Sequence, residues 1–186
     1  MVKVQLDPEH GTLMLSEAAK SRILELLPRY PDKRSVTIAA LRIAQEEHGH
    51  VTDAAMADIA VLLEVTPVQV YETATFYTMF NLQPVGKYLI QVCRTLSCAL
   101  VGAEGLIRHL EQKLGISAGE TTPDGFFTLR KVECLAGCGA GPMMQINDDY
   151  YEYLTNEKVD RILDDLKRDG KSSLASGPFL IPLEVG

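Results

Sequence analysis

The fold and the chemistry of this chain are decided by two stretches, Val92-Cys-Arg-Thr-Leu-Ser-Cys98 and Val132-Glu-Cys-Leu-Ala-Gly-Cys138. They hold all four cysteines of the chain as two close pairs, one with four and one with three intervening residues. Each pair follows a strand-like run of residues. Because loops at the ends of neighbouring strands can bring four thiolates to one point, the pattern predicts a metal or cluster site formed by Cys93, Cys98, Cys134 and Cys138.

Three kinds of site could explain this cysteine pattern. A pair of structural disulfides needs an oxidising compartment, and residues 1–15 lack the basic and apolar regions of an export signal. Structural zinc fits the closer pair, because zinc knuckles separate their ligands by about two to four residues, and it stays as an alternative. Two separated pairs favour a two-iron cluster, with one pair on each iron. The spacings of plant-type and four-iron ferredoxins are both absent.

Four more stretches point to one family: Tyr71-Glu-Thr-Ala-Thr-Phe-Tyr77, Pro84-Val-Gly-Lys87, Thr122-Pro-Asp-Gly-Phe126 and Pro142-Met-Met-Gln-Ile-Asn-Asp148. Together with the two cysteine stretches, and in this order, they span about residues 16–169. This ordered set resembles the small 2Fe–2S subunit of the NADH-oxidising module of respiratory complex I, the E-type subunit family of NADH:quinone oxidoreductase. Related chains occur in NAD-dependent formate dehydrogenases and multimeric hydrogenases.

The resemblance implies a thioredoxin-like ferredoxin domain whose four cysteines ligate one 2Fe–2S cluster. It implies a one-electron carrier subunit of NADH:quinone oxidoreductase, with NADH and FMN bound by a partner flavoprotein subunit that docks against this chain. No Gly-x-Gly-x-x-Gly motif follows a strand here, so no dinucleotide or substrate site is expected in this chain. By the same resemblance the chain is cytoplasmic, a peripheral part of a membrane-bound complex on the cytoplasmic face.

Other functions stay open beside this one. A formate dehydrogenase or hydrogenase complex would use a nearly identical chain. A stand-alone thioredoxin-like ferredoxin would need no helical docking module, which argues against it. A zinc-binding adaptor protein is a further alternative, and it would differ from an iron–sulfur protein in being colourless. The chain also departs from the family pattern: it has no tryptophan, with His50 at the position where relatives usually carry one, and it has Ala136 where glycine is commoner and Gly141 where alanine is usual.

Charge and hydropathy exclude two classes of partner. The 186 residues carry a net charge of −7, which argues against binding to nucleic acid. No apolar run is long enough to cross a bilayer, so direct insertion into a membrane is not expected. Free thiols without an export signal point to a reducing, cytoplasmic setting.

Residues 1–80 are predicted to form a bundle of four short helices that serves as a docking domain. The first helix is capped by Ser16 and stopped by Pro28, and the second opens at Ser35 and ends at His48-Gly49. The third follows Thr52-Asp53, and the fourth follows Thr66-Pro67. Apolar residues at helical spacing are expected to face inward, and the aromatic residues Tyr71, Phe76, Tyr77 and Phe80 are expected mainly to pack in this core. The resemblance supplies an alternative, in which this aromatic stretch lies near the cluster domain and the flavoprotein partner.

Residues 81–86 are predicted to be a linker, and residues 87–170 a thioredoxin-like 2Fe–2S domain with the order β-α-β-β-β-α. A hairpin turns about Asn147–Asp149, where asparagine tolerates a left-handed conformation, and Asn156 caps the last helix, which ends at Gly170. Residues 171–186 form a tail that is either a loosely packed terminus or, through the apolar residues 178–183, a docking peptide.

Two features of the cysteine loops bear on the cluster. Gly137, Gly139 and Gly141 lie close together in the second loop, where they allow positive φ and a close approach of backbone N–H groups to sulfur. Arg94 follows a ligand, and its positive charge is expected to favour the reduced cluster and raise its potential by something on the order of tens of millivolts. The bond before Pro142 is a candidate cis peptide.

Overall fold

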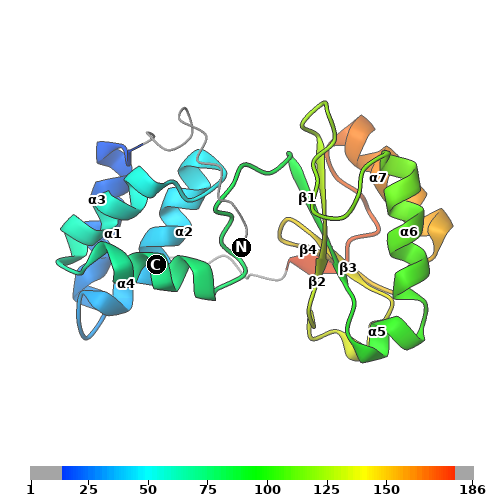
Figure 1. Ribbon diagram of the computed structural model, residues 1–186, viewed down its shortest axis with the longest axis horizontal. Helices are drawn as coiled ribbons and strands as arrows, with labels where there is room; N and C mark the ends of the chain where they lie inside the picture. The colour runs from blue at the N-terminus through cyan, green and yellow to red at the C-terminus, as the bar shows by residue number, and fades with distance from the viewer. Residues whose placement is uncertain (1–13, 179–186) are drawn as a thin grey trace. The chain divides into compact units, whose positions relative to one another are not determined.

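The computed structural model describes residues 14–178, and the chain divides into two compact units between Pro84 and Val85, inside the predicted linker. We call them the helical unit and the sheet unit, because helices alone form the first and a sheet with helices forms the second (Figure 1). Within residues 14–178, every helix falls short of the length and apolarity that a membrane span requires.

The helical unit contains α1 (Glu17–Leu26), η1 (Leu27–Arg29), η2 (Arg34–Val36), α2 (Thr37–His48), α3 (Asp53–Leu63) and α4 (Pro67–Phe76). The predicted caps are confirmed, since the side chains of Ser16, Thr52 and Thr66 each accept a backbone N–H of the helix that follows. The predicted start of the second helix at Ser35 is wrong. Ser35 lies in η2, where both its backbone N–H and its hydroxyl bind the carboxylate of Asp32.

The helical unit has its own core, built from residues of all four α-helices. Most residues predicted to face inward are buried, among them Ile23, Leu41, Ile59 and Leu63. Leu26, Leu27 and Ile38 are only partly buried at the margin of this core.

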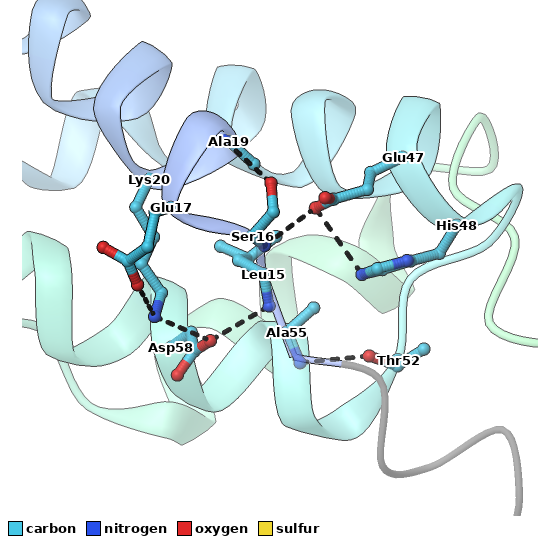
Figure 2. A network of polar contacts seen from close by, with 10 residues as sticks. All are labelled: Leu15, Ser16, Glu17, Ala19, Lys20, Glu47, His48, Thr52, Ala55 and Asp58. Carbon is cyan, nitrogen blue, oxygen red and sulfur yellow. Dashed lines mark hydrogen bonds and ion pairs between the residues drawn. The ribbon is translucent and has the colours of Figure 1, made fainter.

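The start of α1 is held by side chains of two other helices (Figure 2). The carboxylate of Glu47, on α2, accepts the backbone N–H of Ser16 at 3.3 Å. The carboxylate of Asp58, on α3, accepts the backbone N–H of Leu15 at 3.0 Å, and it also lies 3.9 Å from the ammonium of Lys20. Because the first N–H groups of a helix have no partner within it, these carboxylates join α1 to the rest of the unit.

The prediction that Tyr71, Phe76, Tyr77 and Phe80, in and just after α4, pack mainly in the core is wrong for three of the four. Phe80 is buried, but Tyr71, Phe76 and Tyr77 are exposed to 48%, 77% and 39%. Val68, one turn before Tyr71, is 64% exposed. The periodic pattern is present, but α4 turns only Val70 and Ala74 into the core, so Val68, Tyr71 and Phe76 are exposed on a face that also carries Glu72 and Thr75.

The sheet unit contains β1 (Tyr88–Cys93), α5 (Leu96–Leu100), α6 (Ala103–Leu114), β2 (Phe127–Val132), η3 (Cys138–Ala140), β3 (Met144–Ile146), β4 (Asp149–Tyr151), α7 (Asn156–Asp169) and β5 (Gly177–Pro178). The strand order is β2-β1-β3-β4-β5, with β1 and β2 parallel and every other pair antiparallel. Helices α6 and α7 lie on the same side of the sheet (Figure 1), and their apolar residues share one core with the strands.

The predicted order of elements is observed, with α5 and β5 in addition. The hairpin turns at Asn147, which has φ 52° as expected. The predicted cap of the last helix is wrong by one residue, because Thr155 and not Asn156 accepts the N–H of Lys158.

The first part of the tail is ordered against the sheet, contrary to the expectation of a loosely packed terminus. Ser172 is buried and binds Asp165 at 2.9 Å, and β5 pairs with β4. The proposed docking peptide lies almost entirely in residues 179–186, outside the described residues.

Candidate metal centre

The parallel pairing of β1 with β2 brings the two cysteine loops to one edge of the sheet. Cys93 is the last residue of β1 and is in register with Val132, the last residue of β2. The pairing continues for one more step, as the N–H of Arg94 donates to the carbonyl of Val132 at 3.0 Å. Cys134 follows two residues later, so both loops begin at the same place. We call this place the cysteine edge.

The remaining two cysteines fold back toward the same edge. Cys98 lies in α5 and is buried, as is Cys93, whereas Cys134 and Cys138 are exposed. The second loop lies against the first, because a Cβ placed on Gly141 would lie 3.4 Å from Cys98 Sγ. The structure therefore brings all four predicted site residues together, with one pair inside and one pair at the surface.

The thiols approach one another as two pairs. Cys134 Sγ and Cys138 Sγ lie 3.7 Å apart, and Cys93 and Cys98 lie close enough for each to shift the pKa of the other. Two thiolates on one tetrahedral ion, at metal–sulfur distances of about 2.3 Å, lie about 3.8 Å apart. The outer pair therefore has the spacing of two ligands on one metal ion. Within residues 14–178, no three His, Cys, Asp or Glu side chains are already arranged around a single ion.

The thiols differ in how readily they ionise. Burial opposes ionisation of Cys93, but hydrogen bonds from the Thr95 hydroxyl, from the backbone of Leu135 and Thr95 and from Cys98 outweigh burial and lower the pKa of this thiol. Burial and the adjacent Cys93 raise the pKa of Cys98 to about 11. The hydrogen bond with Cys134 raises the pKa of Cys138. Because metals bind thiolates, loading the site has to displace these protons.

Arg94 does not act as a lone cation at the cysteine edge. Its Nε and Nη2 donate to one carboxylate oxygen of Glu133 at 3.1 and 2.6 Å. Arg94 directly follows Cys93, and Glu133 directly precedes Cys134, so this pair joins the two cysteine loops. The carboxylate offsets the positive charge that was expected to raise the potential. Both side chains are more than half exposed, at 54% and 70%, so water and salt weaken the pair.

The expected role of the loop glycines is only partly confirmed. Gly137 and Gly141 have φ of −97° and −70°, so neither supplies a positive φ. Instead they allow close packing, since a Cβ on Gly137 would overlap the thioether of Met143 and one on Gly141 would come within 3.0 Å of Val101 Cγ2. The positive φ, 63°, falls on Ala136. The N–H of Ala136 donates to Cys134 Sγ at 3.3 Å. The Gly141–Pro142 peptide is cis.

Sequence reasoning missed two residues of this site, Thr95 and Glu133, and gave no role to a third, Ala136. Thr95 lies between two cysteines, and a hydroxyl two residues after a ligand was a usable signal. Ala136 was noticed as a departure from the family, and its positive φ explains why glycine is the commoner residue there. Glu133 gave no signal, because its pairing with Arg94 depends on the register of β1 against β2.

Comparisons with known proteins agree with this geometry. Residues 23–167 match the family model described as thioredoxin-like [2Fe-2S] ferredoxin. An E-type subunit of NADH-quinone oxidoreductase from Rhizobium meliloti (strain 1021) is 49% identical over 75% of this chain and 83% of its own length. The E-type subunit of NADH-quinone oxidoreductase from Rickettsia felis is 44% identical over 80% of this chain and 90% of its own length.

A solved structure shows the same fold at lower identity. An NAD+-reducing [NiFe]-hydrogenase in the air-oxidized state matches 70% of this chain with a TM-score of 0.62 and 22% identity, and this chain covers 22% of the hydrogenase chain. The family match covers most of the sequence, including all four cysteines and both strands that lead to them. This chain therefore belongs to the thioredoxin-like [2Fe-2S] ferredoxin family, and its cofactor is a 2Fe–2S cluster.

Proposed function

We propose that this chain is the one-electron carrier of the NADH-oxidising module in an NADH:quinone oxidoreductase, with its 2Fe–2S cluster held by Cys93, Cys98, Cys134 and Cys138. The observation that carries the proposal is the register of β1 with β2, which gathers all four cysteines of the chain at one edge as two pairs. The two relatives described above are both subunits of that enzyme and match most of this chain.

The cluster, when bound, accepts and gives up one electron at a time. The chain itself orders the sulfur ligands and supplies N–H and O–H donors to them. NADH gives up two electrons as a hydride, so a flavin in a partner flavoprotein subunit has to accept the pair and pass electrons on singly. A one-electron acceptor at the cysteine edge can receive the electrons that the flavin passes on one at a time. No step of hydride transfer is assigned to this chain.

Two apolar surfaces support a role inside a larger assembly. One is the exposed face of α4 in the helical unit, formed by Val68, Tyr71 and Phe76. The other lies beside the cysteine edge, where Leu96 and Leu100 are exposed to 75% and 78%. Exposed apolar side chains that gather in this way are typical of protein–protein contact sites. We place the assembly at the cytoplasmic face of a membrane, with this chain as a peripheral subunit.

The ligand assignment is tested by metal and sulfide analysis of the anaerobically purified chain and of its four single Cys→Ser variants. We expect two irons and two sulfides per wild-type chain and a rhombic S = 1/2 EPR signal only after reduction, as for a two-iron cluster. Each serine variant should lose or alter that signal, whereas the control His109→Ala, at an ion pair between α6 and α7, should keep it. A colourless protein with one bound zinc ion would refute the assignment.

The partner is tested separately. The tagged chain should co-purify from its own cells with an NADH-binding flavoprotein, and NADH should reduce the cluster in that complex but not in the isolated chain. Recovery of a formate dehydrogenase or hydrogenase subunit in its place would move the chain to one of those complexes, and it would leave the cluster assignment intact.

A further inference from the structure

Thr95 occupies the residue before α5, and it does not cap that helix. At the other N-cap positions with a hydroxyl in the described α-helices, the hydroxyl accepts a backbone N–H three residues later: Ser16 at 3.1 Å, Thr52 at 3.0 Å, Thr66 at 3.3 Å and Thr155 at 3.2 Å. Such a cap stabilises the start of a helix. The Thr95 hydroxyl instead lies 3.2 Å from Cys93 Sγ.

The direction of this hydrogen bond follows from the chemistry of the ligand. A cysteine that binds iron is a thiolate, which has no proton to donate. The threonine hydroxyl has one proton and can donate it. In the cluster-loaded protein the bond therefore runs from Thr95 to the sulfur of Cys93.

The surroundings of Cys93 make this bond effective. Cys93 is only 2% exposed, so a water molecule from bulk solvent cannot take the place of the hydroxyl, and a hydrogen bond in such a setting is electrostatically stronger than one in water. Cys134 and Cys138 are exposed, so solvent can supply donors to them. The hydroxyl of one side chain thus changes the hydrogen bonding of the Cys93 sulfur more than it would change that of Cys134 or Cys138.

We propose that the hydroxyl of Thr95 sets the reduction potential of the cluster, holding it higher by donating a hydrogen bond to Cys93. A donor withdraws electron density from the ligand sulfur, and the additional negative charge of the reduced cluster is then better accommodated. The helix cap is given up for this contact. The inference rests on the proposed ligation by Cys93.

Three variants separate this role from a structural one. Thr95→Val keeps the branched shape and loses the hydroxyl, and Thr95→Ser keeps the hydroxyl. Thr155→Val is the matched control, because it removes a threonine cap from α7 at a position where Thr155 bonds to Lys158 and not to a cysteine. The midpoint potential is measured by EPR-monitored redox titration of the full chain. We expect a shift to lower potential in Thr95→Val and wild-type values in Thr95→Ser and Thr155→Val.

A second readout observes the hydrogen bond itself. Replacing H2O by D2O should shift the resonance Raman bands of the iron–thiolate stretches in the wild type and in Thr95→Ser, and shift them less in Thr95→Val. If Thr95→Val does not retain its cluster, Thr95→Ala removes the same hydroxyl without the branched side chain, and its potential is compared with that of Thr95→Ser.

The outcomes are distinct. A hydroxyl-free variant with two irons, two sulfides and an unchanged potential overturns the inference and leaves the proposed function standing. A Thr95→Ser variant that shifts as far as Thr95→Val also overturns it, because the effect would then come from side-chain shape. A wild-type chain without two irons and two sulfides would overturn the proposed function first.

Discussion

At the scale of single residues, Ala136 shows how a loop can depart from the conformation that its residue prefers. Its φ of 63° lies in the left-handed region, which costs a residue with a Cβ about 1–2 kcal/mol relative to glycine. The loop keeps this conformation because the N–H of Ala136 then reaches Cys134 Sγ. The local strain and the sulfur contact come from the same backbone turn.

Replacing Ala136 by glycine should therefore relieve the strain of about 1–2 kcal/mol in the folded loop and slow the loss of the cluster. The measurement is the half-life of the visible absorbance of the cluster in an iron chelator. Gly139→Ala is the control, since Gly139 has no positive φ and a Cβ there meets nothing within 4 Å. A shorter half-life in Ala136→Gly would contradict the argument.

The pair of Arg94 and Glu133 leads to a prediction about charge. Arg94→Ala leaves the carboxylate of Glu133 uncompensated and should lower the midpoint potential, whereas Glu133→Gln leaves the cation uncompensated and should raise it. The double variant should lie close to the wild type. Because both side chains are largely exposed, the differences should shrink at high salt. Shifts of the same sign in the two single variants would show that shape, not charge, is responsible.

At the scale of elements, some helix starts could be predicted and others could not. Ser16, Thr52 and Thr66 were predicted because capping depends on residues only three positions apart. Thr155 and Asn156 are both favourable N-cap residues, so the sequence alone could not show which of them caps α7. The exposed aromatic residues of α4 were predicted to be buried, because periodicity shows which residues share a face and not what covers that face.

The start of α1 gives a pH prediction. Hydrogen bonds from Ser16 lower the pKa of Glu47, so the unfolded chain binds this proton more tightly than the folded one. The stabilisation is therefore present above the ordinary pKa of glutamate and is lost as pH falls through the lower folded pKa. Glu47→Gln should reduce hydrogen-exchange protection of α1 at pH 7 and have less effect at acidic pH. Glu72→Gln, on the exposed side of α4, should change neither.

The exposed face of α4 gives a prediction about assembly. Phe76→Lys places a charge on this face and should weaken co-purification with the partner flavoprotein, because a charged residue is unfavourable in the core of a contact. Val61→Lys, on α3 and 78% exposed, is the control. The secondary structure of the isolated chain, followed by circular dichroism, should not change in either variant. Equal loss of the partner in both variants would remove α4 as the specific contact.

At the scale of the whole molecule, the separate cores of the two units imply separate responses to loss of the cluster. Removing the iron with a chelator should increase hydrogen exchange in the two cysteine loops, where buried apolar residues alone form only a small cluster around Cys93, Cys98, Ala103 and Met143. Helices α1 to α4 should keep their protection. Equal loosening of both units would show that the cluster stabilises the chain as a whole.

The cysteine pattern favoured a two-iron cluster, and the ordered set of six stretches predicted the family; both the cofactor and the family are confirmed by the family match. The ligand set of four cysteines stays a prediction. The spacing of the cysteines could not predict the contacts around them. The pairing of Glu133 with Arg94 depends on strand register, and the packing of Met143 on Gly137 depends on the path of the second loop; only the contact of Thr95 with Cys93 is local enough to be read from the sequence.

The close packing of Gly137 on Met143 has a further consequence. The thioether of Met143 is fully buried, and the absence of a Cβ at Gly137 is what makes room for it. A sulfoxide is larger and polar, so it has no place beneath the closed loop. We therefore expect Met143 to resist peroxide while the loop is packed as described, and its sulfoxide to mark chains in which the loop has left that conformation.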